Sequence, residues 1–284
     1  MIVAVASGKG GTGKTTVAVS LALSVDGPVR LLDCDVEEPN CHLFLAPDIV
    51  RRETVGVPVP VVDETKCDAC GLCAEVCEYN AIAALKTRPL VFPELCHGCG
   101  GCTLVCPKGA ITEGSRMIGV VESGRAGRVA FVHGRLRVGE AMAPHLIRAV
   151  KKHAGDDMIN IVDAPPGTSC PVIAAVRGSD HVILVTEPTP FGLHDLTLAV
   201  ETVREMGLSF GVLINRADIG DDRVRRYCAA EGVPVLAEIP DDRRIAEAYS
   251  RGETAIEAVP EMRGLFRALL SAVAQMCQVT GTRQ

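Results

Sequence analysis

Tryptophan is absent from this 284-residue chain, and only three tyrosines and six phenylalanines occur. With so few aromatic side chains, the chain lacks the stacking surfaces on which proteins hold unpaired bases. An excess of positive charge is also missing, because the formal net charge is −6. Binding to nucleic acid is therefore not expected.

Long apolar runs are missing as well. No apolar stretch approaches the roughly 18 residues that a membrane-spanning helix requires. Gly8 and Lys9 interrupt the apolar start, so no secretory signal is predicted. We therefore expect a cytoplasmic protein without membrane association. Disulfides are rare in that compartment, so the 13 cysteines are better explained by metal binding.

Short apolar runs alternate with helical patterns through most of the chain. Strands separated by helices imply right-handed crossovers, so we predict an α/β fold with a mostly parallel sheet and helices on both faces. The predicted strands are 2–6, 29–34, 158–162, 181–186, 210–214 and 235–239, and the predicted helices are 14–25, 139–153, 171–177, 192–206, 221–231, 243–250 and 260–277.

Residues 62–115 break this alternation with cysteines, glycines and short helices. They contain an internal repeat, in which "CDACGLCAEVCEYNAI" and "CHGCGGCTLVCPKGAI" share cysteine spacing, a glycine after the second cysteine and a closing Ala-Ile. The flanking segments "VGVPVPVVDET" and "VESGRAGRVAFVHGRL" are expected to be extended or hairpin structure. We therefore predict one domain formed by 1–61 and 116–284, with a second domain, 62–115, inserted into it.

The sequence "GKGGTGKT", from Gly8 to Thr15, matches the pattern G-x-x-x-x-G-K-[ST] between an apolar strand and a helix. Backbone N–H groups of such a loop and of the helix N-terminus form an anion-binding nest. Lys14 is predicted to reach the β- and γ-phosphates, and the Thr15 hydroxyl to bind Mg²⁺. The predicted phosphate and Mg²⁺ contacts are Gly8, Lys9, Gly10, Gly11, Thr12, Gly13, Lys14, Thr15 and Thr16.

An additional lysine, Lys9, directly follows the first glycine of this loop. The segment "KGGTGKT" resembles the deviant Walker motif of the MinD/ParA and nitrogenase-iron-protein class of ATPases. The resemblance implies ATP hydrolysis in a nucleotide-sandwich dimer, in which Lys9 reaches the phosphates of the partner. That partner is either a second copy or a paralogue. A solvated loop lysine is the alternative for Lys9.

Further parts of the same class follow in order. "LLDCDVEEPN" ends a strand with Asp33 and Asp35 on one side. Asp35 resembles the switch I aspartate that positions the attacking water, and Asp33 is placed to support Mg²⁺ through water. "NIVDAPPGT" resembles the Walker B strand and switch II, where Asp163 holds the Mg²⁺ shell and Gly167 reports the γ-phosphate through its N–H group. The residues predicted to carry hydrolysis are Lys9, Lys14, Asp35 and Asp163.

The resemblance also assigns contacts to the rest of the nucleotide. Asn215 of "INRAD" stands where the family contacts the adenine base. Pro240 and Asp241 of "IPDD" are expected beside the base and the ribose. Ordinary turn chemistry after a strand is the alternative for all three residues.

Both cysteine runs have the spacing C-x₂-C-x₂-C-x₃-C, in which three thiolates hold one [4Fe–4S] cluster and the fourth serves the other cluster. Zinc is the alternative, but two complete runs and Pro107 after the last cysteine favour iron–sulfur clusters. Glu78 replaces the proline of the first run and removes no ligand. The predicted ligands are Cys67, Cys70, Cys73 and Cys106 for one cluster, and Cys77, Cys96, Cys99 and Cys102 for the other.

Nearly the whole chain thus resembles MinD-superfamily P-loop ATPases with an inserted ferredoxin domain. We predict an ATPase that couples a nucleotide-dependent dimer switch to electron transfer through two clusters, toward a redox or metallocluster partner. One alternative is a cluster assembly or carrier ATPase, because "DAPPGTS" is close to switch II of Mrp-type scaffolds. The late C-x-x-C pair of those scaffolds is missing here, where Cys228 and Cys277 stand alone. A second alternative is a MinD/ParA-type positioning ATPase, although the apolar stripe of the last helix is typical of a core helix.

Overall fold

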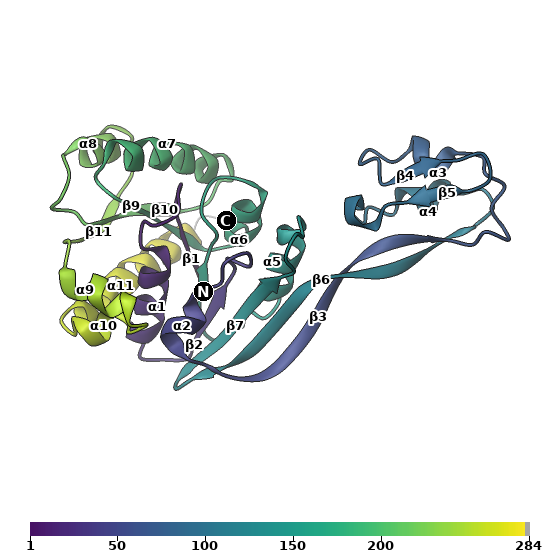
Figure 1. The fold of residues 1–284 in the computed structure, drawn as a ribbon. Helices are drawn as coiled ribbons and strands as arrows, with labels where there is room; N and C mark the ends of the chain where they lie inside the picture. The colour runs from purple at the N-terminus through teal and green to yellow at the C-terminus, as the bar shows by residue number, and fades with distance from the viewer. Residues whose placement is uncertain (282–284) are drawn as a thin grey trace.

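The fold is built around a nine-stranded sheet (Figure 1). The computed structural model describes the backbone of residues 1–281 and the side chains up to residue 278. The strand order is β11-β10-β9-β1-β8-β2-β7-β6-β3, and neighbouring strands are parallel from β11 to β7. The strands are β1 (Ile2–Ala6), β2 (Val29–Asp33), β3 (Asp48–Val62), β6 (Ile111–Ala126), β7 (Val129–Leu136), β8 (Ile159–Asp163), β9 (His181–Thr186), β10 (Phe210–Asn215) and β11 (Val235–Ile239).

Helices cover both faces of this sheet, which explains why its parallel strands are mostly apolar. On one face, α1 and α11 bury side chains such as Leu21 and Phe266 against the strands. On the other face, α5 to α8 contribute Leu146, Val172 and Val200. The helices are α1 (Lys14–Ser24), α2 (Cys41–Leu45), α5 (Ala143–Lys151), α6 (Cys170–Val176), α7 (Pro190–Glu205), α8 (Arg223–Ala230), α9 (Arg243–Ser250), α10 (Ala255–Ala258) and α11 (Met262–Gly281).

The predicted α/β architecture is confirmed, and each predicted strand and helix is present with ends that differ by a few residues. The short helices α2 and α10 were not predicted, and β7 joins the main sheet beside β2. The apolar stripe of α11 is buried, with Phe266, Leu269 and Val273 in the core. Among the described residues, no helix is both long and apolar enough to cross a membrane.

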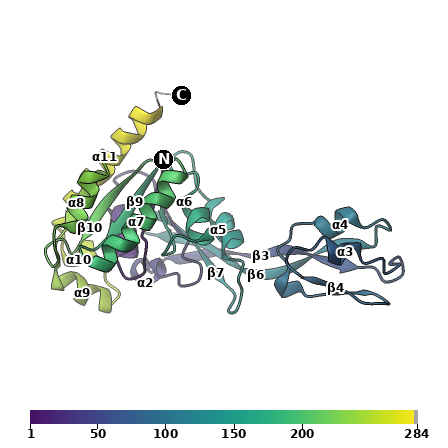
Figure 2. The ribbon, with the colours of Figure 1, turned by 90° about the horizontal axis from the view of Figure 1, so that it is seen from above.

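Strands β3 and β6 extend beyond the sheet as an antiparallel arm (Figure 1). Strand β6 pairs with β3 from residue 111 to residue 125, but it pairs with β7 only from residue 119 to residue 126, so the part nearer the lobe is a two-stranded arm. A small lobe at the far end of the arm, residues 63–110, stands apart from the sheet in both views (Figure 2). We call it the cysteine lobe. It contains α3 (Leu72–Glu75), β4 (Ile82–Ala84), β5 (Pro89–Val91), the 3₁₀ helix η1 (Pro93–Leu95) and α4 (Gly101–Val105).

Candidate functional site

The phosphate loop joins β1 to α1 and lines a cavity of about 400 Å³. Gly13 has a φ angle of 92° and lies so close to Asn215 that an added Cβ would stand 2.6 Å from its Nδ2 atom. A side chain at position 13 is therefore excluded twice, by backbone conformation and by space. Residues predicted from distant segments meet in this cavity, namely Gly10, Gly11, Gly13, Lys14, Thr15, Thr16, Asp35, Asn215, Pro240 and Asp241.

An acidic corner lies where the loop meets the carboxyl end of β8. The Thr15 hydroxyl donates to Oδ2 of Asp163 at 2.8 Å. The other Asp163 oxygen, Oδ1, is buried without a hydrogen-bond partner among the described residues, as is Oγ1 of Thr12. A hydroxyl beside a buried carboxylate with a free oxygen suits Mg²⁺, which prefers oxygen ligands and retains several waters. Thr15 and Asp163 therefore fit their predicted role, and bound Mg²⁺ would neutralise phosphate charge there.

Two buried carboxyl groups, one half-buried carboxyl group and one lysine determine the electrostatics of this corner. Burial, and then the charge of Asp163, raise the pKa of Asp35 to about 6, while Lys14 opposes the shift. Burial also raises the pKa of Asp33 well above its usual value and raises that of Asp163. Burial lowers the pKa of Lys14, against the attraction of Asp163 and Asp35. The corner holds more acidic groups than cationic ones, so an added divalent cation would stabilise it.

Asp33 and Cys41 form a contact that the motifs do not identify. Asp33 accepts the backbone N–H of Asp35 at 3.2 Å and that of Cys41 at 3.0 Å. The Cys41 thiol in turn donates to Oδ2 of Asp163 at 3.3 Å. Asp33 thus anchors the backbone of the switch I segment, and one ligand atom from each of Asp33, Cys41 and Asp163 lies within 4.8 Å of the others. Cys41 belongs to no recognisable motif, so the sequence carried no signal for it.

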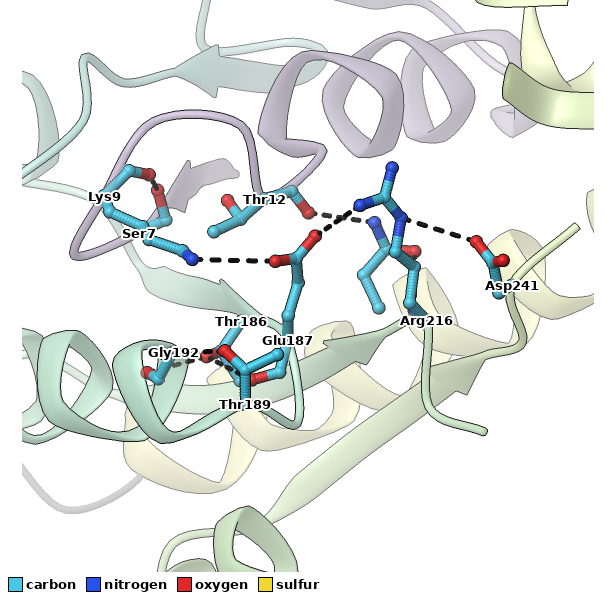
Figure 3. Close-up of polar contacts among 10 residues, drawn as sticks. Ser7, Lys9, Thr12, Thr186, Glu187, Thr189, Gly192, Arg216 and Asp241 are labelled. Carbon is cyan, nitrogen blue, oxygen red and sulfur yellow. Dashed lines mark hydrogen bonds and ion pairs between the residues drawn. The ribbon is translucent and has the colours of Figure 1, made fainter. Parts of the chain in front are cut away.

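Lys9 faces its own chain rather than the cavity (Figure 3). Its Nζ atom lies 3.6 Å from Oε2 of Glu187, a buried residue directly after β9. Glu187 also pairs with Nη1 of Arg216 at 3.0 Å, and Nε of Arg216 lies 3.4 Å from Asp241 (Figure 3). A chain of charges thus runs from Lys9 to the rim of the nucleotide cavity. The position of Glu187 at the carboxyl end of a parallel strand, where α/β sheets bind ligands, was the signal available in the sequence.

Two predicted nucleotide contacts are hydrogen-bonded to the phosphate loop in this structure. The N–H group of Gly167 donates to the Ser7 carbonyl at 2.9 Å. The side-chain amide of Asn215 donates to the Thr12 carbonyl, also at 2.9 Å. Gly167 must therefore leave Ser7 before its N–H group can contact a γ-phosphate. This hydrogen bond joins the segment predicted as switch II to the phosphate loop, and a γ-phosphate that accepts the same N–H group would compete with it.

The eight cysteines of the two runs surround two separate cavities in the cysteine lobe. Site 1 is lined by Cys67, Cys70, Cys73 and Cys106. Site 2 is lined by Cys77, Cys96, Cys99 and Cys102. Each cavity thus takes three cysteines from one run and the fourth from the other, the same grouping as the predicted ligand sets.

The surroundings of the sulfur atoms are suited to thiolates. The N–H group of Ala81 points to Sγ of Cys77 at 3.3 Å, and that of Ala110 points to Sγ of Cys106 at 3.3 Å. These two bonds occupy equivalent places in the internal repeat. Such N–H groups stabilise negative charge on sulfur and are one means by which a protein tunes a cluster. Four sulfurs around each cavity therefore fit a [4Fe–4S] cluster, which supplies one-electron chemistry when bound.

Equivalent positions of the internal repeat carry different side chains beside the two sites. At site 1, Asp68 and Lys108 form an ion pair at 3.7 Å. At site 2, the rings of Tyr79 and His97 are stacked with their centroids 3.7 Å apart. Both pairs line their cavities. The repeat therefore places two cysteine sites in unequal surroundings.

Comparisons with known proteins agree with this architecture. The family model described as the CobQ/CobB/MinD/ParA nucleotide binding domain matches residues 3–255. An uncharacterized protein of Methanocaldococcus jannaschii is 31% identical over 259 residues, which are 89% of this chain and 91% of that protein. An iron–sulfur cluster carrier protein of Aquifex aeolicus is 24% identical over 99% of this chain and 68% of its own length. The structure of the septum site-determining protein MinD from Pyrococcus horikoshii, complexed with Mg–ADP, covers 100% of this chain and 98% of its own, with a TM-score of 0.57 at 23% identity.

Proposed function

Because the chain belongs to the CobQ/CobB/MinD/ParA nucleotide-binding domain family, we propose that it binds and hydrolyses Mg–ATP and couples this cycle to electron transfer through two [4Fe–4S] clusters. One observation carries the proposal. Two cavities, each lined by four cysteines, lie at the end of an arm whose strands belong to the same sheet as the nucleotide site.

The nucleotide half of the proposal assigns a role to each residue in the cavity. The backbone N–H groups of the loop and the ammonium of Lys14 bind the phosphates. Thr15 and Asp163 hold Mg²⁺, and Asp35 orients the attacking water. Asn215, Pro240 and Asp241 contact the base and the ribose from the opposite wall of the cavity.

The cluster half assigns residues 62–115 to an inserted ferredoxin-like domain and the rest of the chain to the ATPase domain. Site 1 and site 2 each hold one [4Fe–4S] cluster through four thiolates. A redox partner docks at the cysteine lobe, which stands clear of the sheet (Figure 2). Electrons then enter and leave without any contact between that partner and the nucleotide.

Pairing with a second copy or a paralogue links the two halves. In the paired state, Lys9 leaves Glu187 and reaches the phosphates bound by the partner. Glu187 keeps its 3.0 Å contact with Arg216 when this happens, so no buried carboxylate is left without a cation. ATP therefore favours the paired state through Lys9, and hydrolysis reverses it.

The rate of electron delivery tests this proposal. The anaerobically reduced protein is mixed with a one-electron acceptor dye, with and without Mg–ATP, and the dye is followed in a stopped-flow spectrometer. We expect Mg–ATP to change the rate in the natural chain and to leave the rate of Lys14→Ala unchanged. Equal rates with and without Mg–ATP in the natural chain would contradict the redox coupling.

A second candidate function is delivery of iron–sulfur clusters. It is favoured by the relatives that are named iron–sulfur cluster carrier proteins, at 24% and 26% identity. Mixing the loaded chain with an acceptor apo-ferredoxin separates the two functions. A carrier loses its iron to the acceptor in an ATP-dependent way, whereas an electron-transfer protein retains its iron after many reduction cycles.

A further inference from the structure

We propose that helix α5 transmits the nucleotide state to site 2, so that the cluster of site 2 responds to nucleotide and the cluster of site 1 does not. The inference rests on the proposed function, because it assumes that both sites hold clusters. The last residue of α5 is hydrogen-bonded to α6, and the residues before α5 are joined to strand β6 of the arm by an ion pair. In both views α5 is the helix of the main body on the side of the cysteine lobe (Figures 1 and 2).

The last residue of α5 is fastened to α6, the helix that follows switch II. The ammonium of Lys151 donates to the carbonyls of Ala175 and Arg177, both at 2.5 Å. These carbonyls lie at the C-terminal end of α6, where a cation is favoured by the helix dipole. Switch II itself contacts the phosphate loop through the bond from Gly167 to Ser7. A displacement of switch II therefore reaches α5 through α6.

The start of α5 is fastened to the arm. Glu140 accepts the backbone N–H groups of Ala141 and Met142 at 3.0 and 3.1 Å. The same carboxylate forms an ion pair with Arg116 of β6, and the two side chains are 5% and 13% exposed. Breaking a buried ion pair leaves an uncompensated charge, so the start of α5 and the arm move together.

Site 2 is packed against this end of the arm. Its cavity is lined by Pro58 and Val59 of β3, and a Cβ on Gly98 would stand 3.0 Å from Pro58. Cys96 and Val59 belong to one continuous apolar cluster with Leu146 of α5. Packing therefore continues without a break from α5 to a ligand of site 2.

Within residues 1–278, none of these contacts with α5 involves site 1. Its Cys73 belongs to a second, small apolar cluster with Ile82 and Ile111, which adjoins Cys77 and Cys102 of site 2 but contains no residue of α5. Its cavity is closed by Ala84, Leu85 and Pro89 of the β4–β5 hairpin, which lies within the lobe. A movement of α5 thus changes the packing and solvent exposure of site 2 first, and these are determinants of a cluster's reduction potential.

Single-site chains allow the two clusters to be measured apart. Cys67→Ser with Cys106→Ser leaves site 2 intact, and Cys77→Ser with Cys96→Ser leaves site 1 intact. Each loaded chain is titrated anaerobically, with electron paramagnetic resonance detection, with and without a non-hydrolysable Mg–ATP analogue. We expect the midpoint potential to shift with nucleotide in the site 2 chain and to stay constant in the site 1 chain.

Two variants in the site 2 chain test α5 itself. Lys151→Met removes the donor to α6 and should reduce the nucleotide-dependent shift by more than half. Lys152→Met, a change at the exposed neighbouring lysine, is the matched control and should retain the full shift. Glu140→Gln keeps the carbonyl acceptor but removes the charge that pairs with Arg116. It should also reduce the nucleotide-dependent shift by more than half, and it provides the test if Lys151→Met does not fold.

The outcomes separate this inference from the proposed function. An equal shift in both single-site chains, or a shift in site 1 alone, would overturn the inference while redox coupling stands. A full nucleotide-dependent shift in both Lys151→Met and Glu140→Gln would show that α5 does not transmit the nucleotide state to site 2. No shift in either chain would overturn the inference, and the dye-reduction rates would then decide whether the proposed function falls with it.

Discussion

Lys9 and Glu187 lie 3.6 Å apart within one chain, although the family resemblance predicts that Lys9 acts on the nucleotide of a partner. The lysine side chain is about one-third exposed and the glutamate is nearly buried. Since Arg216 holds the same carboxylate, Glu187 can release Lys9 and remain paired. The contact with Glu187 is therefore the one that Lys9 makes in the unpaired chain. In the proposed dimer, Lys9 contacts the phosphates bound by the partner instead.

Removing the charge of Glu187 should favour the paired state. Glu187→Gln weakens the hold on Lys9, and a partly exposed ion pair contributes about 0.2–1 kcal/mol. A dimer of two copies breaks this contact once in each chain, so dimer formation with a non-hydrolysable Mg–ATP analogue should tighten by up to about 30-fold, as measured by analytical ultracentrifugation. Glu231→Gln, which breaks an exposed pair with Arg204 at 2.9 Å, is the control and should have no effect. Weaker dimerisation of Glu187→Gln would show that Glu187 supports pairing instead.

The nucleotide site and the cysteine sites should be separable by mutation. Lys14→Ala removes the buried ammonium that we propose contacts the phosphates, so binding of a fluorescent ATP analogue should be lost. The iron content of the chain should stay the same, because the cysteine lobe lies at the far end of the arm (Figure 1). Loss of iron from Lys14→Ala would contradict the division into two modules.

If the fourth cysteine of each run binds the cluster of the other run, the choice of two cysteines decides whether a double change removes one cluster or both. Cys77→Ser with Cys96→Ser removes two ligands of site 2 and should leave one cluster, with about half of the iron. Cys77→Ser with Cys67→Ser damages both sites and should leave neither cluster intact. Iron analysis and the visible spectrum of the loaded chains measure both results. If the second pair kept a cluster and the first lost both, each run would ligate its own cluster.

The pKa of Asp35 predicts how the stability of the nucleotide-free chain depends on pH. Burial and Asp163 raise this pKa from 3.8 to about 6 on folding. The folded chain therefore keeps a proton that the unfolded chain has already released. The resulting stabilisation is fully present below the unfolded pKa and is lost as pH rises toward the folded one.

Asp35→Asn should remove this part of the dependence, so its stability should change less between pH 4 and pH 6 than that of the natural chain. Urea unfolding followed by circular dichroism measures it, since the chain has no tryptophan to report by fluorescence. Asp156→Asn, at an exposed turn, is the control and should retain the natural slope. Equal slopes for Asp35→Asn and the natural chain would exclude Asp35 as the source.

The parallel sheet and the phosphate loop were predictable because their signals are local. Apolar runs and glycine spacing identify β1, α1 and the parallel strands that follow. The place of the arm strands in the sheet was harder to predict from the sequence, because Pro58 and Pro60 disfavour a strand in the middle of a sheet. They are tolerated in β3 because it is an edge strand that pairs only with β6.

The pairing of side chains from distant segments had no local signal. Glu187 is one acidic residue after one strand, and only the folded chain brings it to Lys9. The ion pair between Arg116 and Glu140 joins residues 24 positions apart, and nothing in either segment indicates the other. Such contacts depend on how the arm and α5 pack together, which the motifs do not specify.

The most direct test of the central claim is an anaerobic redox titration of the natural chain, with and without a non-hydrolysable Mg–ATP analogue. Linkage gives the result its meaning, because a shift of about 59 mV in a one-electron couple equals a tenfold difference in nucleotide affinity between the two redox states. Coupling between the nucleotide cavity and the cysteine lobe predicts a shift in the potential of one cluster. Potentials that coincide with and without nucleotide would contradict it.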